Sequence, residues 1–447
     1  MTFAWYAHLQ NLADRPWYVA AIRRVLRLPR RRRAVTTARL ALVLALALTG
    51  RPPAGLAAQQ PAERARDLGI PVEGTPGPLD AITDVRGVTV GHTTIIRGTG
   101  RLTPGTGPVR TGVTAILPRG RDDLSPVFAG WFSMNGNGEM TGTAWVEDYG
   151  LLFYPIAITN TNSVGTVRDA LIEWGATRLP DALHCCLPVV AETWDGDLND
   201  IFGFHVTKAH VFDAIAAARA GPVAEGNVGG GTGMQCLGFK GGIGTASRRL
   251  PETRGGFTVG ALVQCNFGLR RLLRIAGIPV GQELRVEEPC YDTREPLDST
   301  LAPERCARTS GESGAAPRET EHGSIIVVLA TDAPLLPHQL KRIARRAALG
   351  IGRMGGIAGA GSGDLFVAFS TAPTGTPDRR GVAKVEMLSD DVIDPVYEAA
   401  VQATEEAIIN AMLAARTMTG ANWYRVPALP HDGLREVLRR HGRLVGK

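Results

Sequence analysis

The 447-residue sequence lacks the short motifs that would assign a metal or nucleotide chemistry directly. It has six cysteines but no Cys-x-x-Cys pair, and it has no His-Glu-x-x-His sequence, so no metal site is indicated. Its glycine-rich stretch, Gly226–Gly244, contains no Gly-Lys-Ser/Thr sequence. That absence argues against a phosphate-binding loop, and the stretch is interpreted as backbone turns that line a cleft.

The excess of positive charge is confined to the N-terminal region. The net charge is +6, but eight arginines lie between Arg23 and Arg39, against Asp14 and Glu63 as the acids of the first 66 residues. The remainder of the chain is therefore near neutral or slightly acidic. A basic patch for nucleic acid is not indicated, and no nucleic-acid partner is expected.

The N-terminal region has the order of features found in an export signal. Basic residues Arg30–Arg33 precede the apolar run Leu40–Leu48, and small residues follow at Ala54–Ala58. This order predicts a signal peptide over residues 30–58, behind an extension of undecided status at 1–29. The apolar run is short for a membrane span, although an uncleaved signal anchor is the alternative. We expect an exported protein, periplasmic or secreted, without stable membrane insertion after signal cleavage.

The mature chain is organised around the junction between Gly323 and Ser324. Upstream, residues 299–321 are polar and contain proline, which predicts a flexible linker within about 290–323. Downstream, Ile325–Ala330 is an unbroken apolar run, typical of a strand buried on both faces. Ser324 is thus predicted to be the first residue of a core strand. Cys290 and Cys306 bracket part of the linker, and a disulfide between them is possible in an oxidising compartment.

The residue types at this junction suit self-cleavage. Gly323 has no side chain to hinder attack on its carbonyl, and the Ser324 hydroxyl lies next to that carbonyl. Cleavage would leave Ser324 with both a hydroxyl nucleophile and a free α-amine as its base. The pKa of an α-amine is about 7.7–8.0, which suits a general base near neutral pH. On the pattern alone, the alternative is a loop that simply ends in a strand.

The rest of the pattern predicts strands followed by alternating strands and helices. Residues 81–90 and 151–159 have the apolar spacing of strands, and 160–163 resemble an N-cap for a helix over 164–174. Helical spacing recurs at 338–351 and at 391–418, where Pro395 is expected to break the start. This order predicts a layered α+β fold in which helices cover a central pair of sheets.

Several motifs between Gly69 and Gly420 together resemble one enzyme family, the DmpA-type aminopeptidases. The resemblance rests on Asp84–His92, Asn160–Gly165, Glu192–Gly196, Gly229–Gly244, Val263–Gly268, Gly323–Val328 and Ala330–Leu335. This family comprises the L-aminopeptidase/D-amidase-esterases and the β-aminopeptidases. The resemblance implies a four-layer αββα sandwich of the self-cleaving N-terminal-nucleophile type, shared with glutamate (ornithine) acetyltransferases. It also implies a homo-oligomer of processed units, with an α-chain part at 67–323 and a β-chain part at 324–447. No cofactor is implied, and the expected substrate is a small peptide, amide or ester.

The same resemblance assigns roles to individual residues. Ser324 matches the family nucleophile. Ser362 and Asp364 match a Ser-x-acid element beside it, where the hydroxyl would hold the proton of the Ser324 amine and the carboxylate would stabilise the ammonium form. Asn266 matches the oxyanion donor. Glu192 matches the acid that pairs with the free amine of the substrate, because a buried ammonium must be paired.

Trp194 departs from the family pattern, which has a tyrosine at this place. Tryptophan offers an indole N–H donor but no acceptor and no ionisable hydroxyl. We expect Trp194 to border the oxyanion pocket, and the change to affect turnover and substrate shape rather than the class of reaction.

Two other functions compete with the self-processing aminopeptidase. An acyltransferase of the same fold would have threonine at an Ala-Thr junction, whereas this chain has Gly323 and Ser324 together with an export signal. A non-processing binding protein that keeps the fold is the second alternative, supported by Trp194 and the long linker. The intact set of Ser324, Ser362, Asp364 and Asn266 argues against it.

Overall fold

The structure is a computed structural model that describes residues 63–178, 187–297, 301, 304–307, 315–373 and 381–445. The predicted signal peptide at 30–58 and the extension at 1–29 lie outside these residues. Among the helices that it does describe, none combines the length and apolar character needed to cross a bilayer.

The larger sheet has six strands in the order β4-β3-β13-β12-β10-β9. Their bounds are β3 Val127–Gly136, β4 Leu151–Leu152, β9 Gly242–Arg249, β10 Thr258–Asn266, β12 His322–Thr331 and β13 Gly361–Ser370. β12 and β13 run parallel, and the other neighbours are antiparallel. Because β12 lies in the middle of the sheet, its apolar run Ile325–Ala330 is buried on both faces, as the sequence predicted.

The smaller sheet has four strands in the order β1-β2-β5-β6. Their bounds are β1 Thr89–Arg97, β2 Val109–Leu117, β5 Ile156–Asn160 and β6 Val190–Thr193. β5 and β6 are parallel, so Asn160 and Thr193 are register partners at the same edge of the sheet. The polar residues Asn160 and Thr193 therefore lie side by side at one end of the sheet.

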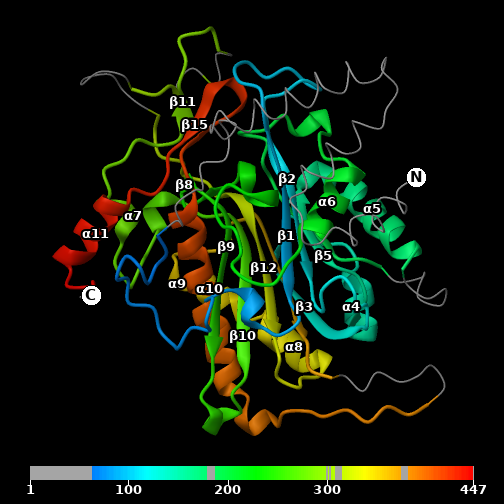
Figure 1. The fold of residues 1–447 in the computed structure, drawn as a ribbon. Coiled ribbons are helices and arrows are strands. Elements are labelled where there is room, and N and C mark those ends of the chain that lie inside the picture. Colours follow the sequence, from blue (N-terminus) through cyan, green and yellow to red (C-terminus); the bar gives the residue numbers. More distant parts are fainter. Residues whose placement is uncertain are drawn as a thin grey trace, which may run out of the picture. The chain divides into compact units, whose positions relative to one another are not determined.

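The two sheets pack face to face, with helices on both outer faces (Figure 1). Ile116 and Ile158 of the smaller sheet share one buried cluster with Leu262, Ile326 and Val367 of the larger. The outer face of the larger sheet packs against α8 (Pro337–Ala344), α9 (Ala347–Arg353) and α10 (Asp394–Ala414). The smaller sheet packs against α5 (Val164–Ala176) and α6 (Lys208–Ala217). This is the predicted four-layer αββα sandwich.

Short elements complete the described chain. The helices are α4 (Thr143–Tyr149), α7 (Val280–Glu283) and α11 (His431–Arg440). Two small sheets consist of β11 (Cys290–Tyr291) with β14 (Met418–Thr419) and β15 (Tyr424–Val426), and of β7 (Gln235–Cys236) with β8 (Phe239–Lys240). The glycine-rich stretch forms a buried 3₁₀ turn, η5 (Gly229–Gly233), ahead of β7.

Several predicted boundaries were wrong. Residues 81–88 form a 3₁₀ turn and a loop, and only Thr89 and Val90 of the predicted strand enter β1. Residues 151–159 divide into β4 and β5, and 338–351 divide into α8 and α9. Pro395 lies in the first turn of α10, where proline needs no hydrogen-bond partner, so it begins that helix rather than breaking it. Ser163 precedes α5 without a side-chain capping bond.

The most consequential correction concerns β12. Ser324 is not its first residue, because the strand begins two positions earlier, at His322. His322 and Gly323 already pair with Gly361 and Ser362 of β13. The Gly323–Ser324 bond therefore lies inside a hydrogen-bonded strand.

Candidate active site

Ser324 lies in the sheet between two residues of neighbouring strands. Its register partners are Asn266 on β10 and Gly363 on β13. The Ser324 side chain is buried, and its Oγ accepts a 3.1 Å hydrogen bond from the Gly363 amide. Alternate residues of a strand share a face, and Ile326 is in the core between the sheets. Ser324 therefore faces the smaller sheet.

Asn266 is the last residue of β10 and stands directly opposite Ser324. Its Oδ1 accepts a 2.7 Å hydrogen bond from the backbone N–H of Gln235, and its Nδ2 donates a 2.9 Å bond to the backbone carbonyl of Trp194. These two bonds determine the orientation of the Asn266 side-chain amide, with Oδ1 toward Gln235 and Nδ2 toward Trp194. A primary amide carries two hydrogens on nitrogen, so one remains to donate to a developing oxyanion.

The pairing of β13 with β12 places Ser362 and Asp364 beside the Gly323–Ser324 junction. Ser362 pairs with Gly323, and Asp364 pairs with Ile325. The Ser362 hydroxyl donates a 2.7 Å bond to Asp364 Oδ1, whereas Asp364 Oδ2 is buried without a hydrogen-bond partner among the described residues. Burial is the main reason that the pKa of Asp364 is raised to about 6, against the opposing effect of the Ser362 bond. A buried acceptor with a free oxygen suits a nearby cation.

Glu192 lies on β6, the edge strand of the smaller sheet, and is 3% exposed. Its Oε1 accepts a 2.9 Å bond from the Glu139 amide, and its Oε2 accepts a bond from the Thr161 hydroxyl. Burial raises the pKa of the Glu192 carboxyl, and these two bonds oppose the rise. None of the groups that shift this pKa most is a cation. The carboxylate is thus oriented by neutral donors, which leaves its charge available to an incoming ammonium.

Trp194 borders the site by its backbone rather than by its indole. Its carbonyl accepts the Asn266 Nδ2–H, while the residue is 41% exposed. The ring packs edge-on against the exposed Phe202, with 6.4 Å between centroids. Trp194 therefore helps to orient Asn266 through its peptide group, and its ring forms part of an apolar rim.

Gly323 occupies a position that only glycine fits. Its φ is +141°, and a Cβ at this position would lie 2.0 Å from the Asn266 carbonyl oxygen. The backbone on the N-terminal side of the junction therefore passes in direct contact with β10. Sequence reasoning chose Gly323 for its open carbonyl, and the structure adds that β10 leaves no room for a larger residue.

Three contributors were missed by the sequence reasoning. The Gly363 amide contacts Ser324 Oγ, the Gln235 amide orients Asn266, and the Thr161 hydroxyl orients Glu192. Thr161 lies in the segment that was interpreted as a helix cap. The first two act through backbone N–H groups, which carry no signature in the sequence.

The described residues bring one set of metal-type ligands together, Glu287 with Cys290 and Cys306. The two sulfurs are bonded to each other at 2.03 Å, so no thiolate is available there, and the disulfide that the sequence left open is present. A second disulfide, Cys236–Cys265, joins β7 to β10 next to Asn266 and was not anticipated.

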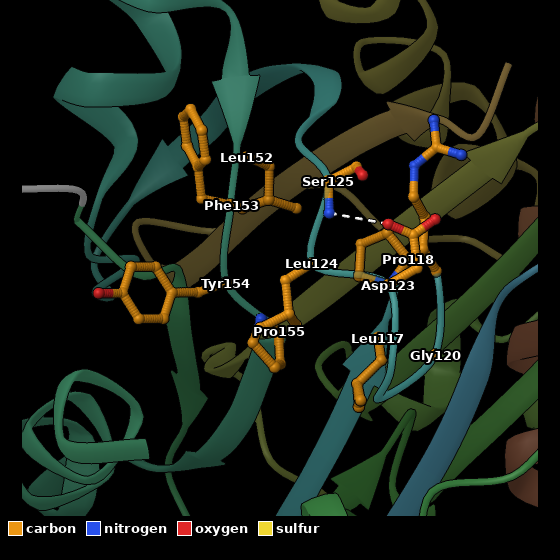
Figure 2. Close-up of a pocket in the computed structure, with 11 residues that line it drawn as sticks. Leu117, Pro118, Gly120, Asp123, Leu124, Ser125, Leu152, Phe153, Tyr154 and Pro155 are labelled. Atoms are coloured by element: carbon orange, nitrogen blue, oxygen red, sulfur yellow. Dashed lines mark hydrogen bonds between the residues drawn. The ribbon is translucent and has the colours of Figure 1, made fainter. Parts of the chain in front are cut away.

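A small pocket at the opposite end of the smaller sheet is not this site. Figure 2 shows its lining by Leu117 at the end of β2 and by Leu152–Pro155 ahead of β5. The candidate residues gather instead beyond the last residue of β5, Asn160. None of the predicted site residues lines this pocket.

Comparison with known proteins agrees with this fold and site. The profile of peptidase family S58 matches residues 80–426. A β-peptidyl aminopeptidase, BapA, of Sphingosinicella microcystinivorans is 54% identical over 391 residues, covering 87% of this chain and 95% of that protein. The structure of an L-aminopeptidase D-Ala-esterase/amidase from Ochrobactrum anthropi, described as a prototype of the serine aminopeptidases with a variant N-terminal-nucleophile hydrolase fold, has a TM-score of 0.75 and 48% identity, covering 86% of this chain and all of that one (100%). A β-aminopeptidase from Burkholderia sp. has a TM-score of 0.74 and 47% identity over 85% of this chain and 99% of that one.

The layers and the relatives together define a serine aminopeptidase with the N-terminal-nucleophile hydrolase fold. This chain belongs to peptidase family S58, the family of the DmpA-type enzymes that its motifs resemble. It is a hydrolase with aminopeptidase activity, and its substrates are peptides.

Proposed function

We propose that this chain is an exported, self-processing enzyme that cuts its own Gly323–Ser324 bond and then hydrolyses N-terminal residues through a Ser324 acyl-enzyme. The observation that carries the proposal is the register of Asn266 with Ser324, which sets a hydroxyl and an amide donor side by side in the sheet. The chain would divide into an α part, 67–323, and a β part, 324–447. A homo-oligomer of such units belongs to the same proposal.

Self-cleavage uses groups on two adjacent residues. Ser324 Oγ attacks the Gly323 carbonyl carbon, the C–N bond breaks, and the hydroxyl proton passes to the Ser324 nitrogen. The product is an ester between Gly323 and Ser324 Oγ. Water then adds OH to the Gly323 carbonyl and returns a proton to Oγ, which leaves a Gly323 carboxylate and a free Ser324 amine.

Turnover reuses the same hydroxyl. The free amine of Ser324 accepts the Oγ proton while Oγ attacks the substrate carbonyl, and the remaining Asn266 Nδ2 hydrogen donates to the oxyanion. The amine returns the proton to the leaving group, and water hydrolyses the acyl-enzyme. Ser362 and Asp364 stabilise the transient Ser324 ammonium, for which Asp364 Oδ2 is a free acceptor. Glu192 binds the ammonium of the substrate.

Two features support the finer parts of the proposal. The disulfides Cys236–Cys265 and Cys290–Cys306 favour an oxidising compartment, which is consistent with export. A relative named a β-peptidyl aminopeptidase makes peptides with an N-terminal β-amino acid the first substrates to test.

Intact-protein mass spectrometry tests the proposal most directly. We expect two chains, the smaller one beginning at Ser324, and a single chain in the Ser324→Ala variant. A wild-type protein that stays whole after long incubation, as Ser324→Ala does, would contradict self-processing and favour a binding protein of the same fold.

A further inference from the structure

Glu321 is a buried carboxylate in a segment that is otherwise exposed. It precedes Ser324 by three residues and is 6% exposed, whereas residues 316–320 are exposed. Its Oε1 accepts a 2.9 Å hydrogen bond from the Gly268 amide, and its Oε2 accepts a 2.9 Å bond from the Gly359 amide. Burying a carboxylate is costly unless both oxygens are paired, so this geometry is specific.

The two glycines belong to the loops that hold the candidate site residues. Gly268 follows Asn266 by two positions, directly after β10. Gly359 precedes β13, and its carbonyl accepts a 2.8 Å bond from the Ser362 amide. The segment ahead of the cleavage point, residues 315–321, is called the strap here. The Glu321 carboxylate therefore joins the strap to two loops, one on each side of β12.

The two hydrogen bonds of Glu321 hold the chain next to Gly323, whose backbone is closely confined by both neighbouring strands. Gly323 is held at φ +141° against the Asn266 carbonyl, and it pairs with Ser362 on the other side. Glu321, two residues earlier, is bonded to the loops next to the same two strands, through Gly268 after β10 and Gly359 before β13. Reaction between Ser324 Oγ and the Gly323 carbonyl requires that this carbonyl keep one orientation, because small misplacements cost large factors in rate.

We propose that Glu321 is a positioning residue for self-cleavage, which holds the Gly323 carbonyl in register with Ser324 through the Gly268 and Gly359 amides. The inference rests on the proposed function, because it concerns the same bond. The Glu321 carboxylate bonds to the Gly268 and Gly359 amides rather than to the reacting atoms, and it positions the segment whose last residue, Gly323, becomes a new C-terminus. Once the bond is cut, the acyl group to be held comes from the substrate, so turnover does not depend on Glu321.

The test follows cleavage of the full-length chain over time by intact mass spectrometry. Glu321→Gln keeps the size of the side chain but points an NH₂ group at one backbone N–H, and we expect its cleavage rate constant to fall about 10- to 100-fold. Glu321→Asp keeps the charge on a shorter side chain and should fall between Glu321→Gln and wild type. Glu319→Gln removes the same charge from an exposed position of the same strap and should cleave at the wild-type rate.

A second readout separates positioning from general damage. Cut Glu321→Gln molecules, counted by their free Ser324 chain, should hydrolyse an aminoacyl anilide with the wild-type kcat/KM. Equal losses in cleavage and in hydrolysis per cut chain would make Glu321 a structural support and overturn the proposal. Wild-type cleavage rates in Glu321→Gln would overturn it while leaving self-processing intact. A wild-type chain that never cleaves would overturn both.

Discussion

Asn266 and Ser324 stand directly opposite each other on β10 and β12, and the Asn266 amide is oriented by the Gln235 N–H and the Trp194 carbonyl. An amide held in this way is preorganised, because it does not need to turn when charge develops on a neighbouring oxygen. The Asn266 N–H is thus a fixed donor beside the Ser324 hydroxyl.

Asn266→Ala should lower kcat for an aminoacyl anilide by about 10²–10³-fold, the usual effect of removing one oxyanion donor. Asn266→Asp is the matched variant, since it keeps an acceptor for the Gln235 amide but loses the donor. We expect Asn266→Asp to be at least as slow. Near-normal kcat in Asn266→Asp would show that the residue only supports the loop.

Glu192→Gln should lower kcat/KM for substrates with a free N-terminal amine by about 10- to 100-fold, because a charge-assisted bond to the ammonium is lost. The exposed Glu139 is the control, since Glu139→Gln keeps the backbone amide that holds Glu192. Wild type should strongly prefer a free amine over the N-acetylated substrate, and Glu192→Gln should not. An unchanged preference in steady-state kinetics would remove Glu192 from the substrate site.

Gly323→Ala should abolish cleavage, because the new Cβ would lie 2.0 Å from the Asn266 carbonyl oxygen at a φ of +141°. Backbone strain of this kind costs about 1–3 kcal/mol, so a lower free energy of unfolding is also expected in urea titrations. Gly352→Ala is the control, since no atom lies within 4 Å of its Cβ position. That variant should cleave normally and unfold no more easily than wild type.

Asp364 should give the rate of substrate hydrolysis by the cut enzyme an acid limb. Its pKa is raised to about 6, and the carboxylate form is the one that stabilises a Ser324 ammonium. The rate should therefore rise with pH through about 6 in the wild type. Asp364→Asn should be slow and should lack this limb, and a limb that persists in Asp364→Asn would assign the titration to another group.

The same shift predicts the pH dependence of stability. Burial raises the pKa of Asp364 from 3.8 to about 6, so the folded state keeps a proton that the unfolded state releases in between. The free energy of unfolding then falls as pH rises from about 4 to 6. Asp364→Asn removes this loss, so it should be more stable than its parent above pH 6 and similar near pH 4. Ser324→Ala is the parent for both urea series, because neither chain should then cleave.

The sequence predicted the central strand because β12 carries a short unbroken apolar run after a polar segment. The layers were predicted from the order of strands and helices, and the four-layer sandwich from the family resemblance. The prediction failed at residues 81–88, where alternating apolar residues occur in a 3₁₀ turn and a loop that pack against the inter-sheet core. Burial on one side produces the same alternation in a strand and in such a loop. Pro395 was misjudged for a different reason, since its effect depends on its place within the helix.

The candidate site was predictable only where side chains carry the chemistry. Ser324, Asn266, Asp364 and Glu192 were named because they match positions of the family's motifs, and their hydroxyl, amide and carboxylate groups suit the roles that the resemblance implies. The bonds that orient them come largely from backbone amides of Gly363, Gln235 and Glu139, which depend on the register of strands far apart in the sequence. Trp194 acts on Asn266 through its carbonyl, so its departure from tyrosine leaves that bond unchanged.

The strand order of the larger sheet has a consequence for the fate of the two pieces. Residues 324–331 of β12 and all of β13 belong to the C-terminal piece, yet they lie between β3 on one side and β10 on the other, both of which belong to the N-terminal piece. A cut at Gly323–Ser324 would leave two polypeptides that both contribute strands to a single sheet. Neither could leave without breaking both the β3–β13 and the β10–β12 ladders. Such a nicked enzyme would run as two bands under denaturing conditions and as one particle under native ones.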